Sequence, residues 1–284
     1  MICISTGLFK DTKTTSILKK LIKKGIKNYE LSAGSFEKNI QKKILPFSKN
    51  NNLFIHNYFP RPKKDFILNL CSSNKIIKKR SFDHVIKGIN LSSKLGTNVF
   101  SFHAGFLIDP KIHEIGKNFK YTKLRNKKIA LKDFIKNVNK LASYAEKKGV
   151  LLLIENNVIT KKNLRKFKKN PLLMSDYKDV EKIMRQTHDN VFLLMDVAHL
   201  KVSSKTLGFC KIRFLKKCEK WIKAYHLSEN DGNYDTNDEV KRKSWFWKYL
   251  KKNVLYYSLE IKFRNISQIK KQITLTKNTL LSFN

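Results

Sequence analysis

The chain alternates between short apolar runs and longer amphipathic segments that are rich in lysine. The apolar runs have the length of strands and are rich in β-branched and aromatic residues, which favours β-strands. Several are almost continuously apolar, as expected of parallel strands covered on both faces. The pattern predicts eight strands, at 2–8, 28–32, 53–59, 98–105, 150–157, 191–200, 224–231 and 256–262.

Between these runs, apolar residues recur at helical spacing. Gly96 follows one such segment and Gly149 another, at positions where a glycine commonly ends a helix. Strand and helix alternate along the whole chain, which is the pattern of a (β/α)8 barrel. The clearest predicted helices lie at 14–24, 81–95, 132–148 and 177–186.

We therefore expect an α/β protein with a single TIM-barrel domain over residues 1–284. An open doubly wound sheet is the alternative, but no glycine-rich phosphate loop follows the first run. Two polar insertions, 106–128 and 160–175, follow the ends of the fourth and fifth runs. Active sites of barrels lie at this end of the strands, so we expect lids or substrate loops there.

The composition indicates the cellular location that we expect for the protein. No stretch of about 18 apolar residues is present, so we expect no transmembrane helix. The N-terminal residues lack the positive region of a signal peptide. The four cysteines are scattered without a C-x-x-C pair, which favours reduced thiols and a cytoplasmic location. The composition leaves a homo-oligomer open.

The net charge of +38 raises the question of nucleic acid binding. Of the 60 basic residues, however, eight are Arg and 52 are Lys, and the lysines are spread over all the predicted helices. Arginine is the residue preferred for forked contacts to phosphates and bases. We therefore favour a solvated lysine-rich surface from an AT-rich coding sequence, although such a field would attract anionic substrates, including sugar phosphates.

Ligand-type residues stand at the ends of four consecutive strands. Glu155 ends the fifth run, Asp196 follows the apolar part of the sixth, and His226 and Glu260 lie in the seventh and eighth. Ionised carboxylates are rarely buried beside such runs unless they are paired or bind a metal. The four side chains would converge above the barrel axis, and together they suit one divalent ion such as Mn²⁺, Mg²⁺, Co²⁺ or Zn²⁺.

Other polar residues near the same strand ends are candidates for substrate binding or for additional metal ligands. Any one of them could equally be an ordinary hydrogen-bonding residue of a loop. His84 and His113 are expected at the surface, and the aromatic residues 245–247 are expected to pack in the core or at an oligomer contact. The candidates are His56, His103, His199, Asp231 and Asp235.

Five stretches together resemble the xylose isomerase-like barrel superfamily, which contains sugar isomerases, sugar epimerases and endonuclease IV. The resemblance covers the third to eighth strands and, more weakly, the whole chain. It depends on the combination, because each motif alone is weak. The stretches are FHAGF at 102–106, LLIENN at 152–157, LLMDVAHL at 193–200, HLSENDG at 226–232 and LEIK at 259–262.

The resemblance to the epimerase branch implies one metal held by Glu155, Asp196, His226 and Glu260. It further implies that Glu155 and Glu260 are the catalytic pair, on opposite faces of a bound ketose, and that His199 contacts substrate oxygens. A metal polarises the substrate carbonyl and acidifies the neighbouring C–H. One carboxylate then removes a proton and the other returns it.

The resemblance to the endonuclease IV branch implies three zinc ions, with His56, His103 and His199 as further ligands. That branch also has an Asp-x-His pair after the seventh strand. Here Asp235-Thr236-Asn237 stands in its place, and an amide is a far poorer zinc ligand than an imidazole.

We therefore predict a metal-dependent sugar or sugar-phosphate isomerase or epimerase, with a carbohydrate as its small-molecule substrate. A phosphodiesterase acting at abasic sites in DNA ranks second. A non-catalytic barrel that binds a metabolite is the third hypothesis.

Overall fold

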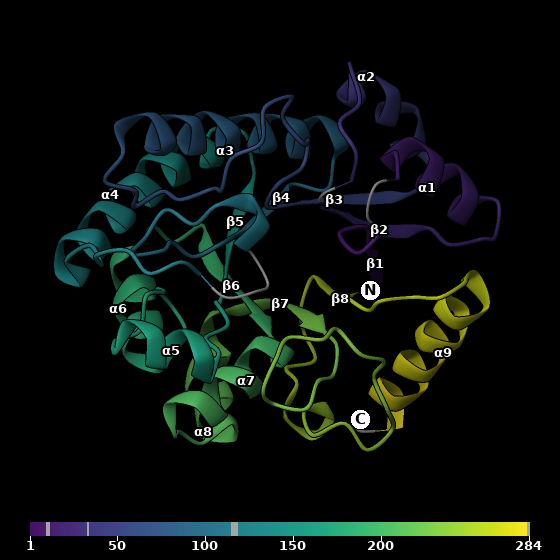
Figure 1. Ribbon diagram of the computed structural model, residues 1–284. Helices are drawn as coiled ribbons and strands as arrows, with labels where there is room; N and C mark the ends of the chain where they lie inside the picture. The colour runs from purple at the N-terminus through teal and green to yellow at the C-terminus, as the bar shows by residue number, and fades with distance from the viewer. Residues whose placement is uncertain (10–11, 33, 115–118, 283–284) are drawn as a thin grey trace.

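The computed structural model describes residues 1–9, 12–32, 34–114 and 119–282. In it, eight parallel strands pair in chain order and close into a barrel, with β1 hydrogen-bonded to β8, and helices surround them (Figure 1). The predicted (β/α)8 barrel is confirmed. The strands are β1 (Ile2–Ser5), β2 (Asn28–Leu31), β3 (Asn52–His56), β4 (Val99–His103), β5 (Leu151–Glu155), β6 (Val191–Asp196), β7 (Ile222–Leu227) and β8 (Tyr256–Leu259).

The helices cover the outer face of the barrel. The helical segments expected at 81–95 and 132–148 both begin earlier, because Asn74 and Asn126 cap them. Each asparagine side chain accepts a backbone N–H of the first turn, a signal that apolar spacing does not carry. The helices are α1 (Thr14–Ile22), α2 (Ile40–Ile44), α3 (Lys75–Leu95), α4 (Lys127–Glu146), α5 (Lys161–Phe167), α6 (Tyr177–Gln186), α7 (Val197–Leu207), α8 (Lys211–Cys218) and α9 (Ile266–Ser282).

The apolar character of the sixth run predicted a strand over 191–200, but the strand does not reach residue 200. β6 ends at Asp196, and residues 197–200 form the first turn of α7. The Asp196 side chain accepts the backbone N–H of His199 at 2.7 Å, which caps the helix. The strand therefore changes to helix without a loop, and His199 is held one turn above the end of the strand.

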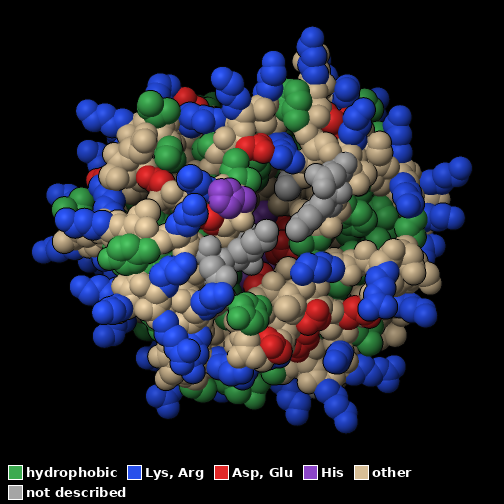
Figure 2. Space-filling model, viewed as in Figure 1, with side chains coloured by type: hydrophobic (Ala, Val, Ile, Leu, Met, Phe, Trp, Pro, Cys, Tyr) green, Lys and Arg blue, Asp and Glu red, His purple; other side chains and the backbone are tan. Residues whose placement is uncertain are grey.

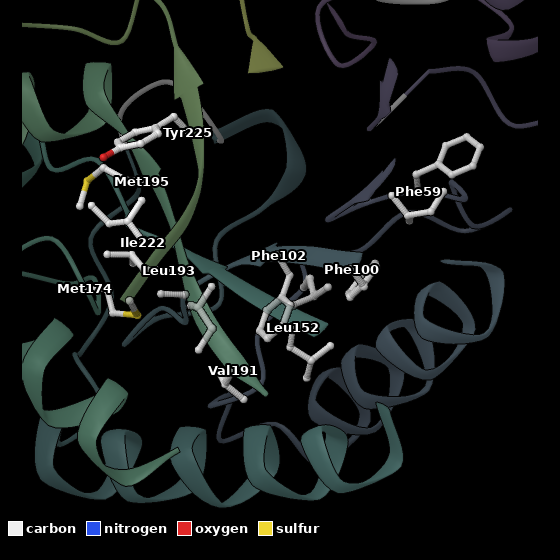
Figure 3. Close-up of a cluster of buried hydrophobic side chains, with 14 of the residues drawn as sticks. Phe59, Phe100, Phe102, Leu152, Met174, Val191, Leu193, Met195, Ile222 and Tyr225 are labelled. Carbon is white, nitrogen blue, oxygen red and sulfur yellow. The ribbon is translucent and has the colours of Figure 1, made fainter. Parts of the chain in front are cut away.

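Side chains alternate between the two faces of each strand. Leu152 and Ile154 of β5 pack in the large cluster between strands and helices, part of which Figure 3 shows. Leu153 belongs to a separate cluster to which seven of the strands contribute, and which fills the barrel interior. Glu155 is in phase with Leu153, so it also faces inward, at the C-terminal end of the barrel.

The two predicted insertions pack against each other above this end of the barrel. With Ile159, which directly precedes the second insertion, they form a small apolar cluster of their own. Residues 115–118 of the first insertion lie outside the described residues. The second contains the short helix α5, which the sequence analysis missed. The cluster consists of Phe106, Ile108, Phe119, Ile159, Phe167 and Leu172.

On the face shown in Figure 2, lysine and arginine side chains project all around the edge, histidine lies beside the central depression, and acidic side chains lie both in the depression and away from it. Among the described helices, none is both long and apolar enough to cross a membrane. Phe246 and Trp247 are buried in the main core, which confirms the expected packing role of this aromatic group.

His84 corrects one expectation, because it is buried rather than at the surface. It lies on α3 between the rings of Tyr58 and Phe66, and its Nε2 lies 3.0 Å from the carbonyl of Asn57. Burial, with a smaller effect of the nearby Lys87, lowers the pKa of His84 to about 4. His113, by contrast, is exposed as expected.

Since the unfolded chain takes up a proton at His84 near pH 6.5 and the folded chain does so only near pH 4, stability should fall as the pH drops between these values. We expect wild type to lose up to roughly 3 kcal/mol relative to His84→Gln across this window. Urea unfolding of both proteins at several pH values measures the difference. An equal pH dependence of the two would contradict the assignment.

Candidate active site

The candidate residues come together because neighbouring strands end at matching levels. His103 of β4 stands opposite Glu155 of β5, and Asp196 of β6 stands opposite His226 of β7. Glu260 follows β8 directly, and its backbone N–H bonds to the carbonyl of Leu227 at 3.2 Å. The spacing of the strands thus places residues distant in sequence around one point.

Glu155 is the centre of this group and is fully buried. Its Oε2 lies 3.3 Å from Nε2 of His56 and 3.2 Å from Nδ1 of His103. Its Oε1 lies 3.2 Å from Nδ1 of His199 and 3.4 Å from Nδ1 of His226. One carboxylate oxygen therefore faces β3 and β4, and the other faces β6 and β7.

On the side of Glu155 that faces His226, four side chains could hold a divalent cation. One ligand atom from each of Glu155, Asp196, His226 and Glu260 lies within 4.8 Å of the other three. Nδ1 of His226 is 3.0 Å from Oε2 of Glu260 and 3.7 Å from Oδ2 of Asp196. The predicted quartet is therefore assembled in the structure.

The hydrogen bonding of these groups fits a cation. Among the described residues, both oxygens of Glu155, Oδ2 of Asp196 and Nδ1 of His226 are buried without a hydrogen bond of good geometry. Buried polar atoms in such a state are rare and costly. Three carboxylates and one imidazole are also a suitable donor set for a divalent ion.

Asp196 is held with one oxygen toward the centre. Its Oδ1 accepts the His199 N–H that caps α7. The side chain of Asn156 accepts the Asp196 backbone N–H at 2.8 Å and donates to its carbonyl at 3.0 Å. These three hydrogen bonds fix both backbone and side chain, and they leave Oδ2 to face His226.

Burial and neighbouring charges shift the pKa values of these groups. Burial by itself would raise the pKa of Glu155, but His103, His226 and His56 hold it well below its usual range. Burial raises the pKa of Asp196 to about 7 and lowers the pKa of His103 to about 4. At neutral pH, Glu155 is therefore ionised and can bind a cation, whereas Asp196 is only partly ionised.

A second possible cation group lies on the other side of Glu155. Ligand atoms of His56, His103 and Glu155 lie within 4.8 Å of one another. Nδ1 of His56 lies 2.9 Å from the hydroxyl oxygen of Ser101, which directs Nε2 toward Glu155. Glu155 is therefore shared between this group and the quartet.

The residues after β7 are only partly at this site. Oδ2 of Asp235 is 3.3 Å from Nε2 of His199, so these two side chains pair. Asn237 and Asp235 line one cavity with His199. Neither Asn237 nor Asp235 belongs to a possible cation group among the described residues. Asp231 is exposed and lies elsewhere, where its carboxylate accepts hydrogen bonds from Asn233 and Tyr234.

Glu30 of β2 is a buried group of this site that the sequence analysis missed. Its carboxylate lies 2.8 Å from Nε2 of His226 and accepts the hydroxyl of Ser258 at 3.1 Å. The available signal was a carboxylate inside the apolar run at 28–32, the same signal that identified Glu155.

Two neighbouring cavities open above these residues. One, of about 380 Å³, is lined by Glu260, His199 and Asp235 together with apolar side chains of the insertions. The other, of about 420 Å³, lies over the ends of the first strands. Both are large enough for a small metabolite. They share His103 and Phe106.

The fold agrees with the comparison to known families. The family model described as xylose isomerase-like TIM barrel matches residues 23–246, so the chain belongs to that family. A search among curated proteins found no significant match.

Several solved structures share the fold. A D-tagatose 3-epimerase-like protein has a TM-score of 0.75 at 16% identity, with 100% of this chain and 98% of that chain covered. D-psicose 3-epimerase from Clostridium cellulolyticum, solved with D-tagatose, has a TM-score of 0.66 at 15% identity, covering 98% and 99%. The TTHB071 protein from Thermus thermophilus, soaked with ZnCl₂, has a TM-score of 0.60 at 15% identity, covering 98% of both chains. At these identities the likeness concerns the fold.

We expect the purified protein to retain about one divalent ion per chain, because the quartet offers one set of four ligands. Elemental analysis after loading with Mn²⁺ or Zn²⁺ measures the number of atoms per chain. Glu155→Ala should lose the ion, since it removes the shared ligand. Failure of the wild type to bind either ion in excess would show that the quartet is not a metal site.

Proposed function

We propose that this protein is a metal-dependent isomerase or epimerase that acts on a sugar or sugar derivative by proton transfer beside a carbonyl. The observation that carries the proposal is the placement of two glutamates around one cation-fitting point. Oε1 of Glu155 and Oε2 of Glu260 lie 3.4 Å and 3.0 Å from the same nitrogen of His226, and Glu260 lines a cavity of about 380 Å³.

The glutamates would act as the proton-transfer pair. Asp196 and His226 would complete the metal site with them, and the bound ion would polarise the substrate carbonyl and hydroxyl. The low pKa of Glu155 keeps it ionised, as a metal ligand and a proton acceptor must be before the reaction. One glutamate removes the proton from the carbon next to the carbonyl, and the other delivers a proton to the product.

The other polar residues of the cavity would orient the substrate. His103 and the paired His199 and Asp235 line the cavity and can bind hydroxyl groups. Phe106, Phe119 and Leu172 of the apolar cluster line the same cavity. The printed names of the similar structures, a D-tagatose 3-epimerase-like protein and D-psicose 3-epimerase with D-tagatose, support a carbohydrate substrate.

We expect Glu155→Gln and Glu260→Gln each to slow proton transfer by at least about 10²–10⁴-fold, the usual contribution of general acid–base catalysis. The measurement is deuterium incorporation at the carbon beside the carbonyl, in ²H₂O, over a panel of ketoses that includes D-tagatose and D-psicose. Glu181→Gln, on the outer helix α6, is the matched control and should keep the wild-type rate. Near-normal exchange in either active-site variant would exclude the two-glutamate mechanism.

A phosphodiesterase acting at abasic sites in DNA is the second candidate. The convergence of His56 and His103 on Glu155 favours it, since two cations that share Glu155 could be held there. The asparagine at Asn237 weighs against a third ion beside His199 and Asp235, because an amide is a poor zinc ligand. We therefore keep this function second.

With the isomerase function, we expect no incision of an abasic-site duplex by the Zn²⁺-loaded protein, and only salt-sensitive, nonspecific DNA binding from its positive charge. An oligonucleotide cleavage assay with His56→Ala as the control measures this. Incision by wild type that is lost in His56→Ala, with two or more zinc ions per chain, would reverse the ranking. Ligand binding without exchange or incision would instead favour the metabolite-binding barrel.

A further inference from the structure

One buried carboxylate inside the barrel has no role in the proton transfer described above. Glu30 is fully buried, and its contacts connect three strands. Nε2 of His226, from β7, lies 2.8 Å from Oε1 and 3.0 Å from Oε2 of Glu30. The hydroxyl of Ser258, from β8, donates to Oε1 at 3.1 Å.

Both ring nitrogens of His226 face carboxylates, but the group of four possible ligands lies on the Nδ1 side. Nε2 faces Glu30, whereas Nδ1 faces Glu260 at 3.0 Å, Glu155 at 3.4 Å and Asp196 at 3.7 Å. A neutral imidazole carries one N–H, and its other nitrogen has a free lone pair. A divalent ion held by the quartet would take the Nδ1 lone pair, and Glu30 would then keep the proton on Nε2.

We propose that Glu30 is a positioning residue that accepts the Nε2–H of His226, and thereby fixes the tautomer and ring orientation in which Nδ1 can bind the divalent ion. Carboxylates that hold a metal-binding histidine in this way also increase its basicity as a ligand. The inference rests on the metal site of the proposed function, but it does not depend on the reaction or its substrate.

The contacts favour this role over that of a further metal ligand. Glu30, His56 and His226 have ligand atoms within 4.8 Å of one another. Both nitrogens of His56 are already engaged, however, Nδ1 with Ser101 at 2.9 Å and Nε2 with Glu155 at 3.3 Å. The two oxygens of Glu30 lie at hydrogen-bond distance from Nε2 of His226, and Oε1 also accepts the hydroxyl of Ser258.

The first test is the affinity for Mn²⁺ of wild type and of Glu30→Gln, measured by isothermal titration calorimetry at one pH. The amide has nearly the same size but lacks the charge, and its NH₂ group can face Nε2 and stabilise the wrong tautomer. Loss of such an outer partner weakens metal binding by about 10–100-fold, which is the expected result. Equal Mn²⁺ affinity in the two proteins would overturn the proposal.

Glu37→Gln is the matched control. Glu37 is also a buried glutamate, but its carboxylate accepts the backbone N–H of Thr15 at 3.1 Å and its hydroxyl at 2.7 Å, at the start of α1. Its replacement removes a buried carboxylate without touching His226, so Mn²⁺ affinity should stay within a few-fold of wild type. An equal loss of affinity in both variants would indicate a general loss of structure and overturn the specific role.

A second readout uses the wild-type chain and does not depend on the folding of Glu30→Gln. In the Zn²⁺-loaded, ¹⁵N-histidine-labelled protein, nitrogen NMR distinguishes a protonated ring nitrogen from a metal-bound one, with His226→Gln to assign the signals. We expect the proton on Nε2 and the metal on Nδ1. The reverse assignment would overturn the role of Glu30.

The outcomes separate this proposal from the proposed function. If wild type binds neither Mn²⁺ nor Zn²⁺, the metal site of the proposed function is wrong, and the role of Glu30 is overturned with it. If wild type binds Mn²⁺ and Glu30→Gln binds it equally well, only the role of Glu30 is overturned.

Discussion

The surroundings of Glu155 are the constraint on which the site depends. A fully buried carboxylate is strongly unfavourable unless charged or hydrogen-bonding partners surround it. Four histidine nitrogens lie 3.2–3.4 Å from its two oxygens. These histidines come from β3, β4, β7 and the first turn of α7, so they reach Glu155 only when the barrel closes. The chemistry of the site and the closure of the fold are therefore linked through one side chain.

The barrel supplies the geometry that this arrangement needs. Inward-facing positions alternate along each strand, so a polar residue at the last inward position faces the axis rather than the helices. Apolar residues and Tyr256 fill the interior nearer the start of the strands, and Glu30 and Ser258 lie between them and the quartet. The polar groups are arranged in layers, in which deeper residues orient the side chains that face the cavity.

The same frame can serve more than one reaction, and membership of the family does not choose between them. Glu155, His226 and Glu260 would suit the proposed proton transfer beside a carbonyl. On the other side of Glu155, His56 and His103 could hold a second cation. The part of the cavity with His199, Asp235 and Asn237 distinguishes the two proposed functions, because position 237 carries an amide where a third zinc ion would need a second imidazole. The insertions between β4 and α4 and around α5 line the cavity, and they would select the substrate.

The sequence by itself determined the eight strands, the end of the barrel that carries the site, and the residues of the quartet. Apolar runs and the polar residues that end them are local features, so they can be recognised without the fold. It did not reveal the asparagine-capped starts of α3 and α4 or the burial of His84, which depend on contacts that apolar spacing does not encode. Only the tertiary structure showed Glu30 as a partner of His226, because the two residues are 196 positions apart and meet solely through closure of the barrel.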